Sequence, residues 1–224
     1  IIASDVPGND LSAIASGPTV KDESTKEEAI QVLKKFNLSD VLKLSEDDFI
    51  ETPKEDKYLE STSNILLLSN KTALNAMKEK ATELGLISRI YSDKFGSEAK
   101  SAGETLIKMT NPHEILLVGG ETTVKVLNRN GRGGRNQELV LASLPYINDD
   151  ITIVSFDSDG WDNSPFAGSI GDYLTIQKAK ELNINPETFL QENNSYDFFE
   201  KTEDGIITDR LPSNVSDLII IIRK

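Results

Sequence analysis

The chain alternates continuous apolar runs with amphipathic segments from about residue 64 onward. Four runs have the length and apolar content of buried strands: residues 64–69, 114–118, 151–156 and 218–222. A weaker strand is predicted at 86–91, and apolar residues at helical spacing predict helices at 72–84, 97–109, 139–144, 173–182 and 186–192. Strands alternating with helices predict an α/β fold with a largely parallel sheet and helices on both faces.

The first sixty residues have a different pattern. A helix start is predicted at Ser24, with Glu27 three residues later, and the amphipathic segment continues to Phe36. Residues 45–63 are acidic, polar and aperiodic, as expected of a surface excursion or linker. We therefore place a domain boundary between segments 1–60 and 61–224. The chain begins Ile-Ile-Ala without Met, so we expect the tail of a strand whose earlier part is absent.

A Gly-rich stretch follows the apolar run at 114–118. It reads Gly-Gly-Glu-Thr-Thr-Val at 119–124 and Gly-Arg-Gly-Gly-Arg-Asn-Gln-Glu at 131–138. Gly133 and Gly134 leave room for a ligand near backbone N–H groups, and the start of the next helix favours an anion. Arg135 supplies a planar guanidinium for carboxylate or phosphate. A solvated hairpin is the alternative; dinucleotide-binding and Walker motifs are absent.

Acidic residues follow two of the predicted strands. Asp157, Asp159 and Asp162 lie just past the run 151–156, at the kind of sheet edge where α/β proteins bind ligands. A calcium loop is excluded because the twelfth position from Asp157 is Gly168, whereas Mg²⁺ needs only one or two carboxylates plus phosphates. Asp5 similarly follows the apolar start of the chain. The alternative is a capped surface turn for the acidic loop, and a helix cap or a turn residue for Asp5.

Composition narrows the class of protein. The 224 residues carry a formal net charge of −13, which argues against nucleic acid or an anionic membrane as a partner. The absence of Cys excludes disulfides and thiolate metal sites and is compatible with a cytoplasmic location. His113, the single histidine, excludes multi-histidine metal sites. We expect it to have a structural or solvated role. No signal peptide or membrane-spanning run is seen.

Several of these segments, in order, resemble the glycerate kinases that carry a MOFRL domain at their C-terminus. The similar segments are 4–12, 14–20, 119–124, 131–139, 193–199 and 214–218. The resemblance implies transfer of a phosphoryl group from ATP to D-glycerate with Mg²⁺, giving phosphoglycerate. It also implies two α/β domains with the active site between them. Residues 1–60 would then be the tail of a Rossmann-like N-terminal kinase domain plus a linker, and 61–224 the MOFRL-containing domain.

The resemblance also assigns roles to residues. Arg135 resembles the family arginine thought to act in catalysis, and Asp5 the conserved acid of the first-domain signature. Asp159 is the expected metal ligand, and Asp5 or Asp159 would position the metal or accept the substrate hydroxyl proton. The expected substrate- or nucleotide-binding residues are Gly119, Gly120, Glu121, Thr122, Gly133, Gly134, Asn136, Glu138 and Asn214.

The sequence departs from the family pattern at 158–168 and 208–217, which leaves the nucleotide contacts open. Family members run to about twice this length, and their presumed catalytic lysine has no counterpart here. We therefore expect a fragment with half a cleft that is nearly inactive without the N-terminal domain. Two alternatives remain: a non-catalytic module that binds an anion or nucleotide, and a hydroxypyruvate reductase-like oxidoreductase. The phosphorylated hydroxyl, the metal preference and the formation of a homodimer stay open.

Overall fold

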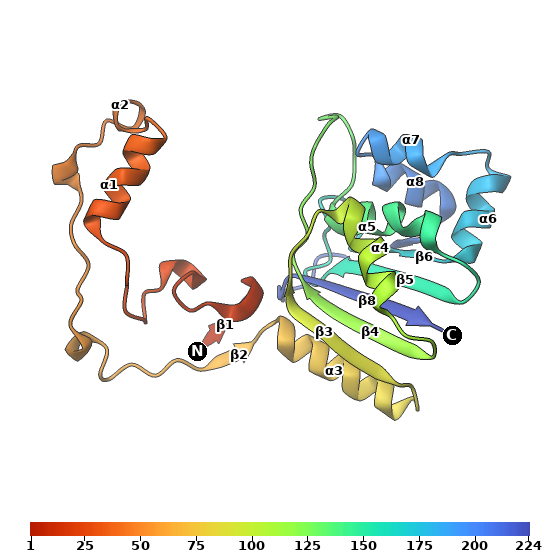
Figure 1. The fold of residues 1–224 in the computed structure, drawn as a ribbon, viewed down its shortest axis with the longest axis horizontal. Helices are drawn as coiled ribbons and strands as arrows, with labels where there is room; N and C mark the ends of the chain where they lie inside the picture. The colour runs from red at the N-terminus through yellow and green to blue at the C-terminus, as the bar shows by residue number, and fades with distance from the viewer. The chain divides into compact units, whose positions relative to one another are not determined.

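A computed structural model describes residues 1–224, which divide into two compact units (Figure 1). The first unit comprises Ile1 and Asp10–Ile65, and the second comprises Ile2–Asn9 and Leu66–Lys224. No helix in either unit combines the length and apolar character that crossing a bilayer requires. The second unit holds both sheets and is the one that carries the candidate site.

The first unit is built around helix α1 (Lys26–Lys35), which buries Ile30 and Leu33. Shorter elements complete it: η2 (Ile14–Ser16), α2 (Ser39–Leu42), η3 (Glu46–Asp48) and η4 (Asp56–Tyr58). The helix starts one residue later than the capping pattern predicted. Thr25 and Glu28 form the capping box, because the Ser24 hydroxyl donates to Asp22 instead.

The second unit contains a six-stranded sheet in the order β3-β4-β8-β5-β6-β7. Its strands are β3 (Ser88–Phe95), β4 (Glu114–Gly120), β5 (Ile151–Asp157), β6 (Gly168–Gly171), β7 (Gly205–Ile206) and β8 (Asp217–Arg223). The short β1 (Ile2–Ala3) and β2 (Leu66–Leu68) form a separate parallel pair, and η1 (Pro7–Asn9) follows β1. The α/β class is confirmed.

The prediction of a largely parallel sheet is wrong. Within the six-stranded sheet only β3 and β4 pair in parallel, whereas β8 is antiparallel to both β4 and β5, and β6 and β7 continue the antiparallel pattern. The predicted alternation holds for β3, β4 and β5, which run in one direction. Strand β8 is reached through the non-helical segment 207–216 rather than a crossover helix, so it enters at the edge where β4 and β5 end.

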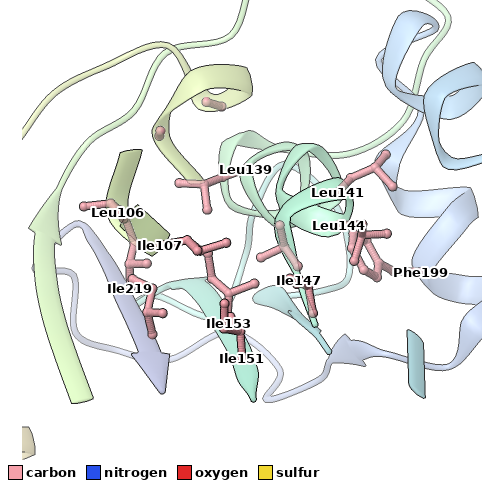
Figure 2. Packing of buried hydrophobic residues seen from close by; sticks show 14 of the residues in the cluster. Leu106, Ile107, Leu139, Leu141, Leu144, Ile147, Ile151, Ile153, Phe199 and Ile219 are labelled. Atoms are coloured by element: carbon pink, nitrogen blue, oxygen red, sulfur yellow. The ribbon is translucent and has the colours of Figure 1, made fainter. Parts of the chain in front are cut away.

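Helices cover both faces of this sheet, as predicted. Helix α3 (Asn70–Glu83) lies on one face, and α4 (Ala99–Met109) and α5 (Arg135–Ser143) lie on the other (Figure 1). Alternate residues of β4 and β8 therefore enter two separate apolar clusters. On the α5 face, Leu139 packs with Ile153 and Ile219 (Figure 2). This packing fixes the start of α5 above the strand ends.

The remaining helices lie near the end of the chain. They are η5 (Leu144–Tyr146), α6 (Tyr173–Glu181), α7 (Pro186–Gln191) and α8 (Ser195–Thr202). Helix α8 and strands β6 and β7 were not predicted. Strands of four and two residues are too short to show a period, and α8 has a polar and aromatic sequence whose Phe198 and Phe199 are fully buried.

Candidate functional site

The candidate site is a cavity of about 350 Å³ beside the ends of β4 and β5. Its walls come from the end of β5, the start of α5, the loop between β4 and α5, and segment 161–163. Its lining residues include Arg135, Glu138, Asp157, Trp161 and Asn193. We call this cavity the Arg135 pocket.

Arg135, the first residue of α5, is surrounded by three acids. Its Nε and Nη2 atoms donate to the two carboxylate oxygens of Asp217 at 3.3 and 3.2 Å. Its Nη1 atom lies 3.2 Å from Glu121 Oε1, and Nη2 lies 3.6 Å from Asp157 Oδ2. Asp217 is 1% exposed and Glu121 47% exposed, so the guanidinium has a buried anchor on one side and a solvated partner on another.

The direction of β8 brings these acids together. Asp217 is the first residue of β8 and pairs with Gly120, the last residue of β4, and with Asp157, the last residue of β5. In a parallel sheet, the first residue of β8 would lie at the opposite edge. The antiparallel insertion therefore adds a buried carboxylate to the edge that carries Arg135.

Burial changes the acidity of both strand-end carboxyl groups. Burial raises the pKa of Asp157 to about 6, against a hydrogen bond from the Asp159 N–H and with help from the charge of Asp217. Burial also raises the pKa of Asp217 to about 6, although Arg135 opposes the shift. The guanidinium of Arg135 thus does not fully offset the cost of burying the charged carboxylate of Asp217.

The start of α5 is already occupied by a carboxylate of the protein itself. Asp162 is 3% exposed and accepts hydrogen bonds from the backbone N–H groups of Asn136, at 3.2 Å, and Gln137, at 2.9 Å. The Gln137 side-chain amide donates to the same carboxylate. The anion that the sequence led us to expect at this helix start is therefore Asp162, and Arg135 is the cation left facing the pocket.

Gly133 and Gly134 line the pocket and also permit close packing of the chain. A Cβ atom on Gly134 would lie 2.2 Å from Asp162 Oδ1, and one on Gly133, whose φ is 134°, would lie 2.2 Å from Ser195 Oγ. The neighbouring Arg132 accepts a hydrogen bond from the Tyr196 N–H through its carbonyl oxygen. Because Gly133 and Gly134 lack side chains, the chain can pack closely against Asp162 and against residues 195–196.

Glu138 lies one helical turn after Arg135 and also lines the pocket. It is 2% exposed; its Oε2 atom accepts a hydrogen bond from Asn193 Nδ2 at 2.9 Å, whereas its Oε1 atom has no hydrogen-bond partner. Burial raises the pKa of Glu138, and the bond from Asn193 opposes the shift. Asn193 also accepts from Leu127 N–H and donates to Lys125 carbonyl oxygen, so it ties the β4–α5 loop to α5.

Several residues predicted for the site lie outside the pocket lining. Gly119 and Gly120 end β4, where a Cβ would meet Asn70 and Phe95, respectively. Buried Asn136 instead bonds Ser155, Asp162 and Asp217. Glu121 contacts Arg135 from outside the lining, and Asp159 accepts a hydrogen bond from the Trp161 N–H. The remaining predicted residues outside the lining are the buried Thr122 and the exposed Asp5 and Asn214. The structure therefore brings Gly133, Gly134, Arg135 and Glu138 together in one pocket.

Sequence reasoning missed Asp217 and the role of Asn193, and named Asp157 only as one member of an acidic loop. Asp217 directly precedes the apolar run 218–222, but its place at the site depends on the strand direction, which the run does not encode.

No group of three or more His, Asp or Glu side chains is arranged to hold a metal ion. Asp157 is the carboxylate that an ion arriving with phosphates would meet in the pocket.

The segment of the chain that carries this site matches a known protein family. Residues 114–217, which hold β4, α5, β5 and the first residue of β8, match the MOFRL family. This part of the chain belongs to the MOFRL family. Residues 1–50 match a domain of unknown function (DUF4147).

Three relatives show the extent of the similarity. The glycerate 2-kinase of Pyrococcus horikoshii is 35% identical over 243 residues, covering 99% of this chain and 55% of that protein. A crystal structure of the glycerate kinase of Thermotoga maritima matches 99% of this chain and 56% of its own, with a TM-score of 0.88 and 32% identity. A putative hydroxypyruvate reductase of Agrobacterium vitis is 29% identical over 238 residues, covering 99% of this chain and 54% of that protein. The chain spans about half the length of these relatives.

Proposed function

We propose that the Arg135 pocket is part of the active site of a glycerate kinase, which transfers a phosphoryl group from ATP to D-glycerate. The observation that carries the proposal is the guanidinium of Arg135, held by a buried carboxylate at a pocket within the MOFRL segment. Phosphoryl transfer depends on positioning and on positive charge near the migrating group. Relatives named glycerate 2-kinase support the choice of substrate.

Arg135 can bind an anion without losing its anchor. Asp217 holds the Nε and Nη2 side of the guanidinium from a buried position. Glu121 faces Nη1 from a largely solvated position, where an ion pair contributes little free energy. A substrate carboxylate or phosphoryl oxygen would therefore replace Glu121 at Nη1, while Asp217 keeps the guanidinium oriented.

Asp157 is the pocket residue best suited to accept the proton of the substrate hydroxyl. It lines the pocket, and its pKa of about 6 is close to neutral pH, where a general base is most effective. The assignment of this role to Asp5 or Asp159 remains a proposal from the sequence that the pocket does not support, because neither side chain lines it.

Mg²⁺ fits this pocket only together with phosphates. Asp157 offers a single carboxylate, and Mg²⁺ commonly takes one or two carboxylates and completes its shell with phosphate oxygens and water. As a direct ligand Asp157 would stay charged, so its role as the base applies only where water separates it from the ion. Bound in this way, the ion would neutralise charge on the phosphates.

We retain the proposal that residues 1–60 belong to an N-terminal kinase domain and that this domain supplies the other wall of the cleft.

The test is a product assay on the gene product that carries this chain, with MgATP and D-glycerate, read by ³¹P NMR. We expect a phosphomonoester resonance that depends on D-glycerate and grows as ADP accumulates. Parallel reactions with hydroxypyruvate and NADH test the reductase alternative. Oxidation of NADH without a phosphomonoester would replace the kinase proposal by that alternative. Calorimetric binding of ATP or glycerate without any product would indicate a binding module.

A further inference from the structure

A second cavity of about 350 Å³ lies beside α5 and shares no lining residue with the Arg135 pocket. We call it the α5–α7 groove. Its lining is mainly apolar and includes Leu141 of α5, Leu144 of η5, Ile176 of α6 and Leu190 of α7. A cavity of this volume is within the range of sites that bind small organic ligands.

The walls of the groove are held by core packing. Leu141 and Leu144 are 1% and 4% exposed and belong to the apolar cluster that contains α5. Ile176 and Leu190 pack against the same cluster from partly buried positions. The groove is therefore formed before any ligand arrives, and a ligand with an apolar body would bury its surface there at little cost in side-chain ordering.

Lys100 of α4 is the one cation that lines the groove. It is half-buried and makes no ion pair, whereas Lys178, the other half-buried lysine of the second unit, lies 3.1 Å from Asp204 Oδ1. Glu104 lies four residues after Lys100 on α4, but its Oε1 atom is 2.5 Å from Lys108 Nζ. The ammonium group of Lys100 is therefore left to pair with an anion that the chain does not supply.

The single acid of the groove limits which anion fits. Glu187 is exposed and accepts a hydrogen bond from Gln191 Nε2 at 3.0 Å, so it lies where the groove meets solvent. A ligand with two or more negative charges would be repelled by this carboxylate, and one charge is enough to pair with Lys100.

The helices around the groove set the length of the ligand. Lining residues come from α4, α5 and α7, and α5 packs against both of the other helices. Packed helices lie about 8–10 Å apart, a distance that an extended chain of about eight carbons spans.

We propose that the α5–α7 groove binds a monocarboxylate with an unbranched apolar tail of about eight carbons. The carboxylate pairs with Lys100, and the tail packs on the apolar residues of α5, α6 and α7. The inference does not depend on the proposed function, because no residue lines both cavities and phosphoryl transfer makes no use of Lys100.

The test is methyl-detected NMR of the 224-residue chain, titrated at pH 8 with sodium octanoate up to about 10 mM. We expect saturable shifts of the methyl signals of Leu141, Ile176 and Leu190, while those of Val124 and Val126 in the Arg135 pocket stay in place. Butyrate lacks four methylene groups and should bind at least about tenfold more weakly. 1-Octanol keeps the tail without the charge and should also bind about tenfold more weakly.

A lysine variant and its control complete the test. Lys100→Gln removes the charge and should weaken octanoate binding about tenfold, so that octanoate and 1-octanol bind alike. Lys78→Gln changes an exposed lysine of α3, on the other face of the sheet, and should retain the affinity of the unmodified chain. The methyl spectrum without ligand shows that each variant is folded.

Three results would overturn the inference: no shifts with octanoate, equal affinity for octanoate and 1-octanol in the unmodified chain, or unchanged affinity in Lys100→Gln. The second result would show an apolar groove without selection for an anion. Phosphorylation of D-glycerate is measured separately by the product assay, so the proposed function stands or fails independently of these titrations.

Discussion

At the scale of single residues, the site is a charge arrangement in which carboxylates outnumber cations. Arg135 contacts Asp217, Glu121 and Asp157, and two of these acids lie directly opposite each other on adjacent strands. Like charges opposite each other in a sheet are destabilising. These carboxylates therefore lower the stability of the folded protein, as expected where charged groups are arranged to bind a ligand.

Replacing Asp157 by Asn should show this cost as a dependence on pH. The pKa of Asp157 rises from 3.8 to about 6 on folding, so the folded protein binds a proton that the unfolded chain has released between these values. Stability is lost as the pH rises through this range. Compared with the unmodified protein, Asp157→Asn should gain about 2 kcal/mol in free energy of unfolding between pH 4 and pH 8.

Urea unfolding at the two pH values measures this difference. The Asn side chain retains an oxygen for the Asp159 N–H, so the comparison isolates the charge. A difference between the two proteins that is the same at pH 4 and pH 8 would contradict the assigned environment of Asp157.

Arg135 and Glu138, both expected at the site from the resemblance, line one pocket because three positions along a helix place two side chains on the same face, and their roles stay a prediction. The sequence could not identify Asp162 as the cap of α5. Asp162 lies 27 positions after Arg135, the first residue of α5, and no local sequence pattern links the two residues. Acidic residues after a strand suggest a ligand site and a turn equally well.

At the scale of elements, the decisive feature is the placement of β8. The apolar run 218–222 predicted a buried strand, and β8 is buried on both faces between β4 and β5. A continuous apolar run has the same appearance in either direction, so the pattern could not predict the antiparallel entry. That entry places Asp217 at the site rather than at the far edge.

The loop between β4 and α5 depends on Asn193 for its position over the pocket. Asn193→Ala removes hydrogen bonds to Leu127, Asn128 and Lys125, and also the bond to Glu138. We expect hydrogen exchange of the amides at 127 and 128 to accelerate at least about tenfold, because each lost bond to a buried group contributes about 1 kcal/mol or more.

Asn185→Ala is the matched control for this loop. Asn185 caps α7 and donates no bond to the loop, so the control should change exchange within α7 alone. Unchanged exchange at 127 and 128 in Asn193→Ala would show that other contacts hold the loop.

At the scale of the whole molecule, the pocket lies within one of the two compact units, Ile2–Asn9 with Leu66–Lys224. The MOFRL match at 114–217 falls inside the same unit. The sequence predicted the α/β class and helices on both faces because buried strands and amphipathic helices have distinct periods. The proposed second wall of the cleft would come from the N-terminal kinase domain.

We propose that phosphoryl transfer requires the guanidinium of Arg135 in the orientation that Asp217 gives it, and one comparison of turnover tests this requirement. Arg135→Lys keeps a positive charge but loses the two-point contact with Asp217 and the fixed direction of Nη1. Arg132→Lys, three residues earlier, changes an exposed arginine paired with Asp197 on the protein surface. Both variants are assayed with MgATP and D-glycerate in the gene product that carries this chain. We predict that Arg135→Lys lowers kcat at least about 100-fold while Arg132→Lys stays within about threefold of the unmodified protein. Equal kcat values for the two variants would show that phosphoryl transfer does not require the oriented guanidinium of Arg135.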